Sequence, residues 1–183
     1  MTIPNILTLT RILLIPLFCV FAFDTNNSGF WVTSHPRNFL VAGLIFVIAA
    51  ATDFLDGYLA RKWNQTTNVG KLLDPLADKL LITSALIALV ENRLVAGWTV
   101  VIILSREFLI TGLRSMLADA GVKASGASNL GKIKTVLQIA AIIAFLFDIE
   151  NTFNNVLYFL AVLFTIISGV DYLWKSREHF KFK

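Results

Sequence analysis

The chain is dominated by long apolar runs that are separated by short polar connections. A bilayer core about 30 Å thick requires roughly 20 apolar residues in helical form, and lipid cannot satisfy the open backbone groups of isolated strands. Apolar residues make up 56% of the 183 residues, more than a soluble domain of this size buries. We therefore expect an all-α polytopic membrane protein, a single domain over residues 1–183 with six transmembrane helices. The expected spans are residues 6–23, 39–59, 75–90, 98–117, 133–147 and 156–174.

The distribution of Lys and Arg between the connections predicts the orientation. Ten basic residues fall on one side of the expected spans and two on the other. Cytoplasmic loops carry the excess of basic residues, so both termini are expected in the cytoplasm. The cytoplasmic set is Arg61, Lys62, Lys71, Lys123, Lys132, Lys134, Lys175, Arg177, Lys181 and Lys183, and the opposite set is Arg37 and Arg93.

Several other classes of function and processing are disfavoured. The net charge of +4 is spread over loops without forming a basic face, so no nucleic-acid partner is expected. A single cysteine, Cys19, excludes an internal disulfide and a cysteine-based zinc site. The first apolar run lacks a small-x-small cleavage pattern and is interpreted as a retained span. His35 and His179 lie in a loop and in the tail, where no chemical role is expected.

Four aspartates stand at or near the ends of the second and third expected spans. Asp53 and Asp56 are three residues apart, and Asp74 and Asp78 are four apart, so each pair shares one helix face. A short connection lets the two pairs converge, and four carboxylates in a small volume require cations. Hard oxygen ligands suit Mg²⁺, Mn²⁺ or Ca²⁺. The structural alternative is a set of ordinary ion pairs with Arg61, Lys62, Lys71 and Lys79.

Small residues accompany the first acidic pair. Gly57 and Ala60 follow on the same helical stripe as Asp53 and Asp56, which allows a ligand or another backbone to approach closely. Close packing of two membrane helices is the alternative use of such residues. Pro75 directly after Asp74 predicts that Asp74 caps the third helix and that Pro75 lies in its first turn.

Together these positions spell D-x2-D-G-x2-A-R-x8-G-x3-D-x3-D, which resembles the signature of the CDP-alcohol phosphatidyltransferase family at every fixed position. The residues are Asp53, Asp56, Gly57, Ala60, Arg61, Gly70, Asp74 and Asp78. The resemblance implies a six-helix, homodimeric membrane enzyme. Such an enzyme moves a phosphatidyl group from a CDP-linked lipid to an alcohol, releases CMP and uses one or two Mg²⁺ or Mn²⁺ ions.

The resemblance also implies a role for each signature residue. Asp78 would complete the metal site and act as the general base that takes the proton of the acceptor hydroxyl. Gly57 and Ala60 would make room for cytidine, and Arg61 would meet phosphate. The implied metal ligands are Asp53, Asp56, Asp74 and Asp78. The implied residues for the CDP-lipid are Asp53, Asp56, Gly57, Ala60, Arg61, Gly70 and Asp74.

Residues outside the signature indicate the acceptor. Residues 4–11, 105–114 and 131–135 resemble the bacterial branch of the family that uses CDP-diacylglycerol and sn-glycerol 3-phosphate in the inner membrane, with the active site facing the cytoplasm. Arg106 and Arg114 lie eight apart, roughly on one helix face, and an arginine fork with nearby lysines suits a second phosphate. The expected acceptor residues are Asn5, Thr8, Arg11, Arg106, Arg114, Lys132, Lys134 and Thr135.

Three alternatives stay open at this point. Arg106 could pair with Glu107 or a neighbouring helix, and the lysines could anchor the protein at lipid phosphates. Another acceptor, such as inositol phosphate, serine or phosphatidylglycerol, would share the same signature. A divalent cation transporter would also keep carboxylates in its spans, although it would favour internal repeats, which the sequence does not contain.

Overall fold

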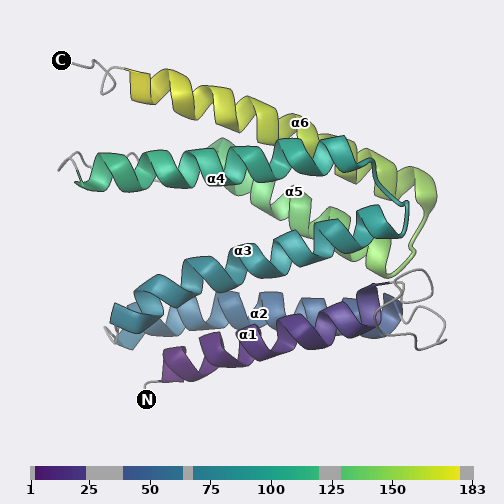
Figure 1. Ribbon diagram of the computed structural model, residues 1–183, viewed down its shortest axis with the longest axis horizontal. Helices are drawn as coiled ribbons and strands as arrows, with labels where there is room; N and C mark the ends of the chain where they lie inside the picture. Colours follow the sequence, from purple (N-terminus) through teal and green to yellow (C-terminus); the bar gives the residue numbers. More distant parts are fainter. Residues whose placement is uncertain (1–2, 24–38, 64–67, 120–128, 178–183) are drawn as a thin grey trace. The chain divides into compact units, whose positions relative to one another are not determined.

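The computed structural model describes residues 3–23, 39–63, 68–119 and 129–177, and the side chains of residues 3–8, 53–75 and 119 lie outside this description. Within these ranges the regular structure is entirely helical, which confirms the all-α prediction. The helices are α1 (Ile3–Ala22), α2 (Phe39–Trp63), α3 (Asn68–Glu91), α4 (Gly97–Asp119), α5 (Asn129–Leu146) and α6 (Asn151–Ser176), as Figure 1 shows.

The helices extend beyond most of the predicted apolar runs, and one predicted helix start is wrong. The third helix begins at Asn68, so Asp74 does not cap it and Pro75 lies at the start of its third turn. Proline removes one backbone hydrogen bond at such a position. The preceding Lys71, Leu72 and Leu73 are strong helix formers, which explains why a helix can begin before the proline.

The chain divides into two compact units, and the first comprises Met1–Leu94. In this unit α1 packs against both α2 and α3 (Figure 1). Phe18 and Phe46 are fully buried, with ring centroids 6.1 Å apart. Asn92 donates from Nδ2 to the Ala22 carbonyl oxygen at 2.9 Å, which ties the end of α3 to the end of α1.

The second unit, Val95–Lys183, is built around α6, which packs against α5 and α4. The Tyr158 hydroxyl shares a 2.6 Å hydrogen bond with the Thr99 hydroxyl. The ring of Tyr158 meets Phe145 edge-on, with centroids 6.1 Å apart. These contacts lie near the beginning of α6 and leave its second half for the polar contacts described below.

Helices α3 and α5 end in the same type of C-terminal cap. Arg93 follows α3 with φ 59°, and Asp148 follows α5 with φ 48°. At α3 the Leu94 amide donates to the Leu89 carbonyl at 2.9 Å, and at α5 the Ile149 amide donates to the Ala144 carbonyl at 3.2 Å. These are Schellman caps, in which a residue with left-handed backbone satisfies the last carbonyls. They satisfy the last carbonyls of each helix within a short connection.

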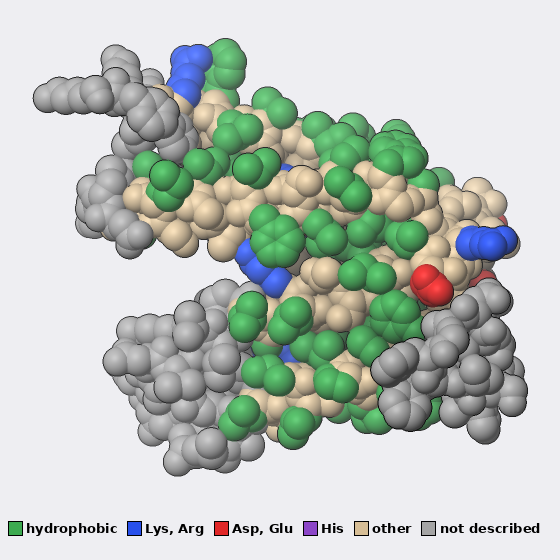
Figure 2. Space-filling model, viewed as in Figure 1, with side chains coloured by type: hydrophobic (Ala, Val, Ile, Leu, Met, Phe, Trp, Pro, Cys, Tyr) green, Lys and Arg blue, Asp and Glu red, His purple; other side chains and the backbone are tan. Residues whose placement is uncertain are grey.

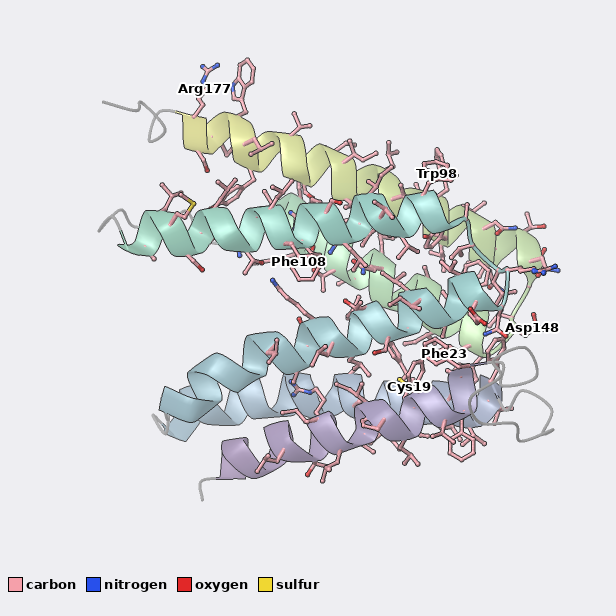
Figure 3. All side chains as sticks on the ribbon, viewed as in Figure 1. Cys19, Phe23, Trp98, Phe108, Asp148 and Arg177 are labelled. Atoms are coloured by element: carbon pink, nitrogen blue, oxygen red, sulfur yellow. The ribbon has the colours of Figure 1, made fainter. Side chains whose placement is uncertain are left out.

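The exposed surface of the helices is apolar, as expected of a membrane protein. Large apolar side chains spread over the helices (Figure 2), and examples such as Leu13 and Val136 are about two-thirds exposed or more. In the described residues α5 and α6 are long and apolar enough to cross a membrane by length and composition. The exposed Trp98 lies at the start of α4, and the exposed Trp174 lies near the end of α6, with the Arg177 guanidinium carbon 4.0 Å from its ring centroid. Figure 3 labels Trp98 and Arg177. Tryptophan at such ends is typical of membrane interfaces.

Candidate active site

The backbone of α2 and α3 carries the acidic signature. Asp53, Asp56, Gly57, Ala60 and Arg61 all lie within α2, which continues to Trp63. Gly70, Asp74 and Asp78 all lie within α3. The two helices pack against each other within the first unit. Both aspartate pairs are therefore on continuous helix, as their proposed sharing of a face requires.

Asp78 is the signature residue whose side chain is described. It is exposed on α3, next to the fully buried Ala77. The side chains of the other seven signature residues lie outside the described residues, so the predicted convergence of the four carboxylates stays a prediction. Among the described side chains no group of three or more His, Cys, Asp or Glu gathers into a metal site.

A partly buried ionic cluster joins α4 to α5 and α6. Glu107 Oε1 accepts from Arg106 Nη1 at 2.9 Å and from Lys134 Nζ at 2.5 Å. Arg106 also donates from Nη2 to Ser168 Oγ at 3.1 Å. Lys134 is 4% exposed, whereas the side chains of Arg106 and Glu107 are 16% and 24% exposed, so the cluster is partly buried. The alternative that Arg106 pairs with Glu107 is confirmed. The cluster brings two cations to the carboxylate of Glu107.

Gly169 allows Arg106 to lie against α6. A Cβ atom built at Gly169 would stand 3.1 Å from Arg106 Cγ, closer than ordinary packing allows. The glycine therefore provides the space for the aliphatic part of the arginine. Small residues commonly bring membrane helices together in this way.

Arg114 lies two turns further along α4 and contacts α6 again. Its guanidinium carbon is 5.2 Å from the centroid of the Tyr172 ring, a cation–π distance. Its Nε atom is buried without a hydrogen-bond partner, and the buried hydroxyl of Tyr172 also has none. The two predicted arginines of α4 thus both face α6, but each has different neighbours.

The other predicted acceptor residues are more scattered. Lys132 is exposed at the beginning of α5, and Thr135 is exposed with its hydroxyl donating to the Gly131 carbonyl at 3.0 Å. Arg11 is fully buried in α1. Asn5 and Thr8 belong to α1, but their side chains lie outside the described residues.

Sequence reasoning missed Ser168 and Tyr172 as partners of the two arginines. The signal was a polar stripe in an otherwise apolar helix: Thr165, Ser168 and Tyr172 follow helical spacing and are all buried. Such spacing places them on one face of α6. In an apolar span the stripe could have identified the side that meets the charged residues of α4.

The chain is similar to known proteins over nearly its whole length. The sequence profile of the family described as CDP-alcohol phosphatidyltransferase matches residues 1–167. A relative from Bacillus subtilis (strain 168) is 44% identical over 188 aligned residues, which cover 98% of this chain and 97% of the relative. A relative from Escherichia coli (strain K12) is 38% identical, with 96% of this chain and 94% of the relative covered.

A third relative, from Rickettsia felis, is 37% identical, with 97% of each chain covered. All three relatives are named CDP-diacylglycerol–glycerol-3-phosphate 3-phosphatidyltransferase. The family profile covers most of the chain and includes the whole aspartate signature. This protein therefore belongs to the CDP-alcohol phosphatidyltransferase family.

Proposed function

We propose that this protein transfers the phosphatidyl group of CDP-diacylglycerol to sn-glycerol 3-phosphate, giving phosphatidylglycerophosphate and CMP. The observation that carries the proposal is the similarity, over nearly the whole chain, to relatives named for this reaction. The chain also keeps all eight fixed residues of the family signature. Phospholipid biosynthesis is the process that this activity serves.

The charged residues of the second unit support an acceptor that carries a phosphate. Three cationic side chains, Arg106, Lys134 and Arg114, lie in the second unit with the carboxylate of Glu107. Cations inside a membrane protein favour an anionic ligand nearby. A phosphorylated alcohol supplies that anion, whereas an uncharged acceptor such as serine lacks its dianionic phosphate.

The acidic signature suits a site for Mg²⁺ or Mn²⁺. Asp53, Asp56 and Asp74, with Asp78, would hold one or two ions, because carboxylates are the oxygen ligands that these ions take together with phosphate groups. The uninterrupted helices around these residues support a shared metal-binding face. When bound, the metal neutralises diphosphate charge. Gly57, Ala60, Arg61 and Gly70 complete the proposed contacts to the CDP-lipid.

Asp78 is the proposed general base. Its exposed carboxylate takes the proton of a free hydroxyl of glycerol 3-phosphate. The hydroxyl oxygen then bonds to the phosphorus that carries diacylglycerol. The bond from that phosphorus to the CMP oxygen breaks, and CMP leaves with the electron pair. Lys132, Lys134, Thr135, Arg106 and Arg114 are proposed to hold the acceptor.

The residues of α1 complete the proposed acceptor site. Asn5, Thr8 and Arg11 follow one another at helical spacing on α1. We further propose that all six helices span the bacterial inner membrane, with both termini and the active site on the cytoplasmic side, and that the protein is a homodimer. The basic residues of the predicted cytoplasmic connections support this orientation.

A transfer assay tests the activity. The full-length protein in mixed micelles with CDP-diacylglycerol, Mg²⁺ and radiolabelled glycerol 3-phosphate should give labelled lipid and one CMP for each product. Serine, inositol phosphate and phosphatidylglycerol in tenfold excess should not compete. Preferred use of any of these acceptors would contradict the proposed acceptor. Activity that survives complete chelation would contradict the metal site alone.

A further inference from the structure

The buried polar stripe of α6 contains one hydroxyl that the fold leaves without a partner. Thr165 donates to the Ala161 carbonyl at 2.6 Å, and Ser168 donates to the Thr165 carbonyl at 3.1 Å and accepts from Arg106. Tyr172 is only 4% exposed, and its hydroxyl has no hydrogen-bond partner. A buried polar group without a partner is unfavourable and rare in folded proteins.

A second unpartnered polar atom lies beside it on α4. The guanidinium of Arg114 stands over the Tyr172 ring at 5.2 Å, and its Nε atom is buried without an acceptor. Arginine carries only donors, and a tyrosine hydroxyl also donates. Two unmatched donors from neighbouring helices, one of them on a cation, are complementary to an anionic oxygen.

Arg114 and Tyr172 lie further along α4 and α6 than the ionic cluster of Arg106, Glu107 and Lys134. Three contacts, Thr99 with Tyr158, Arg106 with Ser168 and Arg114 with Tyr172, advance together along α4 and α6, so these helices run parallel. The step from Arg106 to Arg114 is about 12 Å along α4. The Arg114 and Tyr172 pair therefore lies two turns closer to the carboxyl end of α4, on the side of the helix that faces α6.

We propose that Tyr172 is a further acceptor-binding residue, whose hydroxyl donates a hydrogen bond to a phosphate oxygen that Arg114 also binds. This inference rests on the proposed function, because it assigns the oxygen to the phosphate of sn-glycerol 3-phosphate. The phosphates of the CDP-lipid have the same chemistry, and the experiment separates the two sources. Tyr172 lies beyond the residues that match the family profile, which end at 167.

Tyr172→Phe is a sharp test, because it keeps the ring under Arg114 and removes one oxygen. We expect the KM for glycerol 3-phosphate to rise about tenfold, because the variant loses one hydrogen bond to a charged group. The KM for CDP-diacylglycerol and kcat should stay within about twofold, and inorganic phosphate should inhibit the variant less well than the wild type. The thermal midpoint should not fall, since the hydroxyl has no partner in the fold.

Tyr158→Phe is the matched control in the same helix. Tyr158 is also buried, but its hydroxyl shares a 2.6 Å hydrogen bond with the Thr99 hydroxyl. Its loss should lower the thermal midpoint and leave both KM values unchanged. The two tyrosines thus distinguish a hydroxyl that stabilises the fold from one that binds a ligand.

Three results would overturn the inference. An unchanged KM for glycerol 3-phosphate, a rise confined to the KM for CDP-diacylglycerol, or a Tyr172→Phe variant that fails to fold would each give the hydroxyl a different role. A wild-type protein that does not use glycerol 3-phosphate would instead contradict the proposed function, so the two failures are distinguishable.

Discussion

At the scale of single residues, the carboxylate of Glu107 binds two cations, Arg106 and Lys134. Glu107→Gln leaves Arg106 and Lys134 without their shared anion, whereas Lys134→Met leaves Arg106 and Glu107 as a neutral pair. Losing one partner of a buried ion pair costs about 3–5 kcal/mol. We therefore expect Glu107→Gln to lower the thermal midpoint in detergent far more than Lys134→Met. Equal losses would show that the charge balance of this cluster is unimportant.

The proposed general base, Asp78, gives a second prediction at the residue scale. Asp78→Asn keeps the size of the side chain and removes the proton acceptor, so kcat should fall by about 10²–10⁴. Binding of CDP-diacylglycerol, measured by equilibrium dialysis, should persist. Asp171→Asn is a suitable control, because Asp171 forms only an exposed pair with Lys175 at 2.8 Å, a type of pair that contributes little. Rates like the wild type for Asp78→Asn would remove the proposed base.

At the scale of helices, the Schellman cap of α3 contains a removable strain. Arg93 has φ 59°, a conformation that costs a residue with a Cβ atom about 1–2 kcal/mol and costs glycine almost nothing. Arg93→Gly should therefore stabilise the first unit by about 0.5–1 kcal/mol after the extra entropy of the unfolded glycine is subtracted. Arg93→Ala keeps the Cβ atom and should give no gain. Reversible unfolding in detergent measures both variants, and equal midpoints would contradict the strain.

Helices were predictable from the sequence, but their ends were not. Apolar runs located all six helices because lipid permits little else. The start of α3 at Asn68 was missed, because the sequence signal of Asp74 and Pro75 is outweighed by good helix formers before it. The caps at Arg93 and Asp148 were also missed, since neither position carries the glycine that usually marks them.

At the scale of the whole molecule, the sequence predicted the helices that carry the signature better than the contacts between side chains. The aspartate signature was recognisable because its spacing is fixed by two continuous helices. The cluster around Glu107 was foreseen only as an alternative, and Tyr172 was not foreseen. Contacts of this kind depend on how α4, α5 and α6 pack, and a buried tyrosine in an apolar run resembles any other core residue.

The orientation of the whole chain gives the last prediction. Cys19→Ala removes the single native cysteine, after which single cysteines can replace the exposed residues Arg93, Asp148, Lys132 and Arg177. The excess of basic residues predicts that the last two lie in the cytoplasm. A membrane-impermeant maleimide should label positions 93 and 148 in intact spheroplasts, and positions 132 and 177 only after permeabilisation. Labelling of position 132 in intact spheroplasts would invert the topology and put the proposed site on the wrong side for cytoplasmic glycerol 3-phosphate.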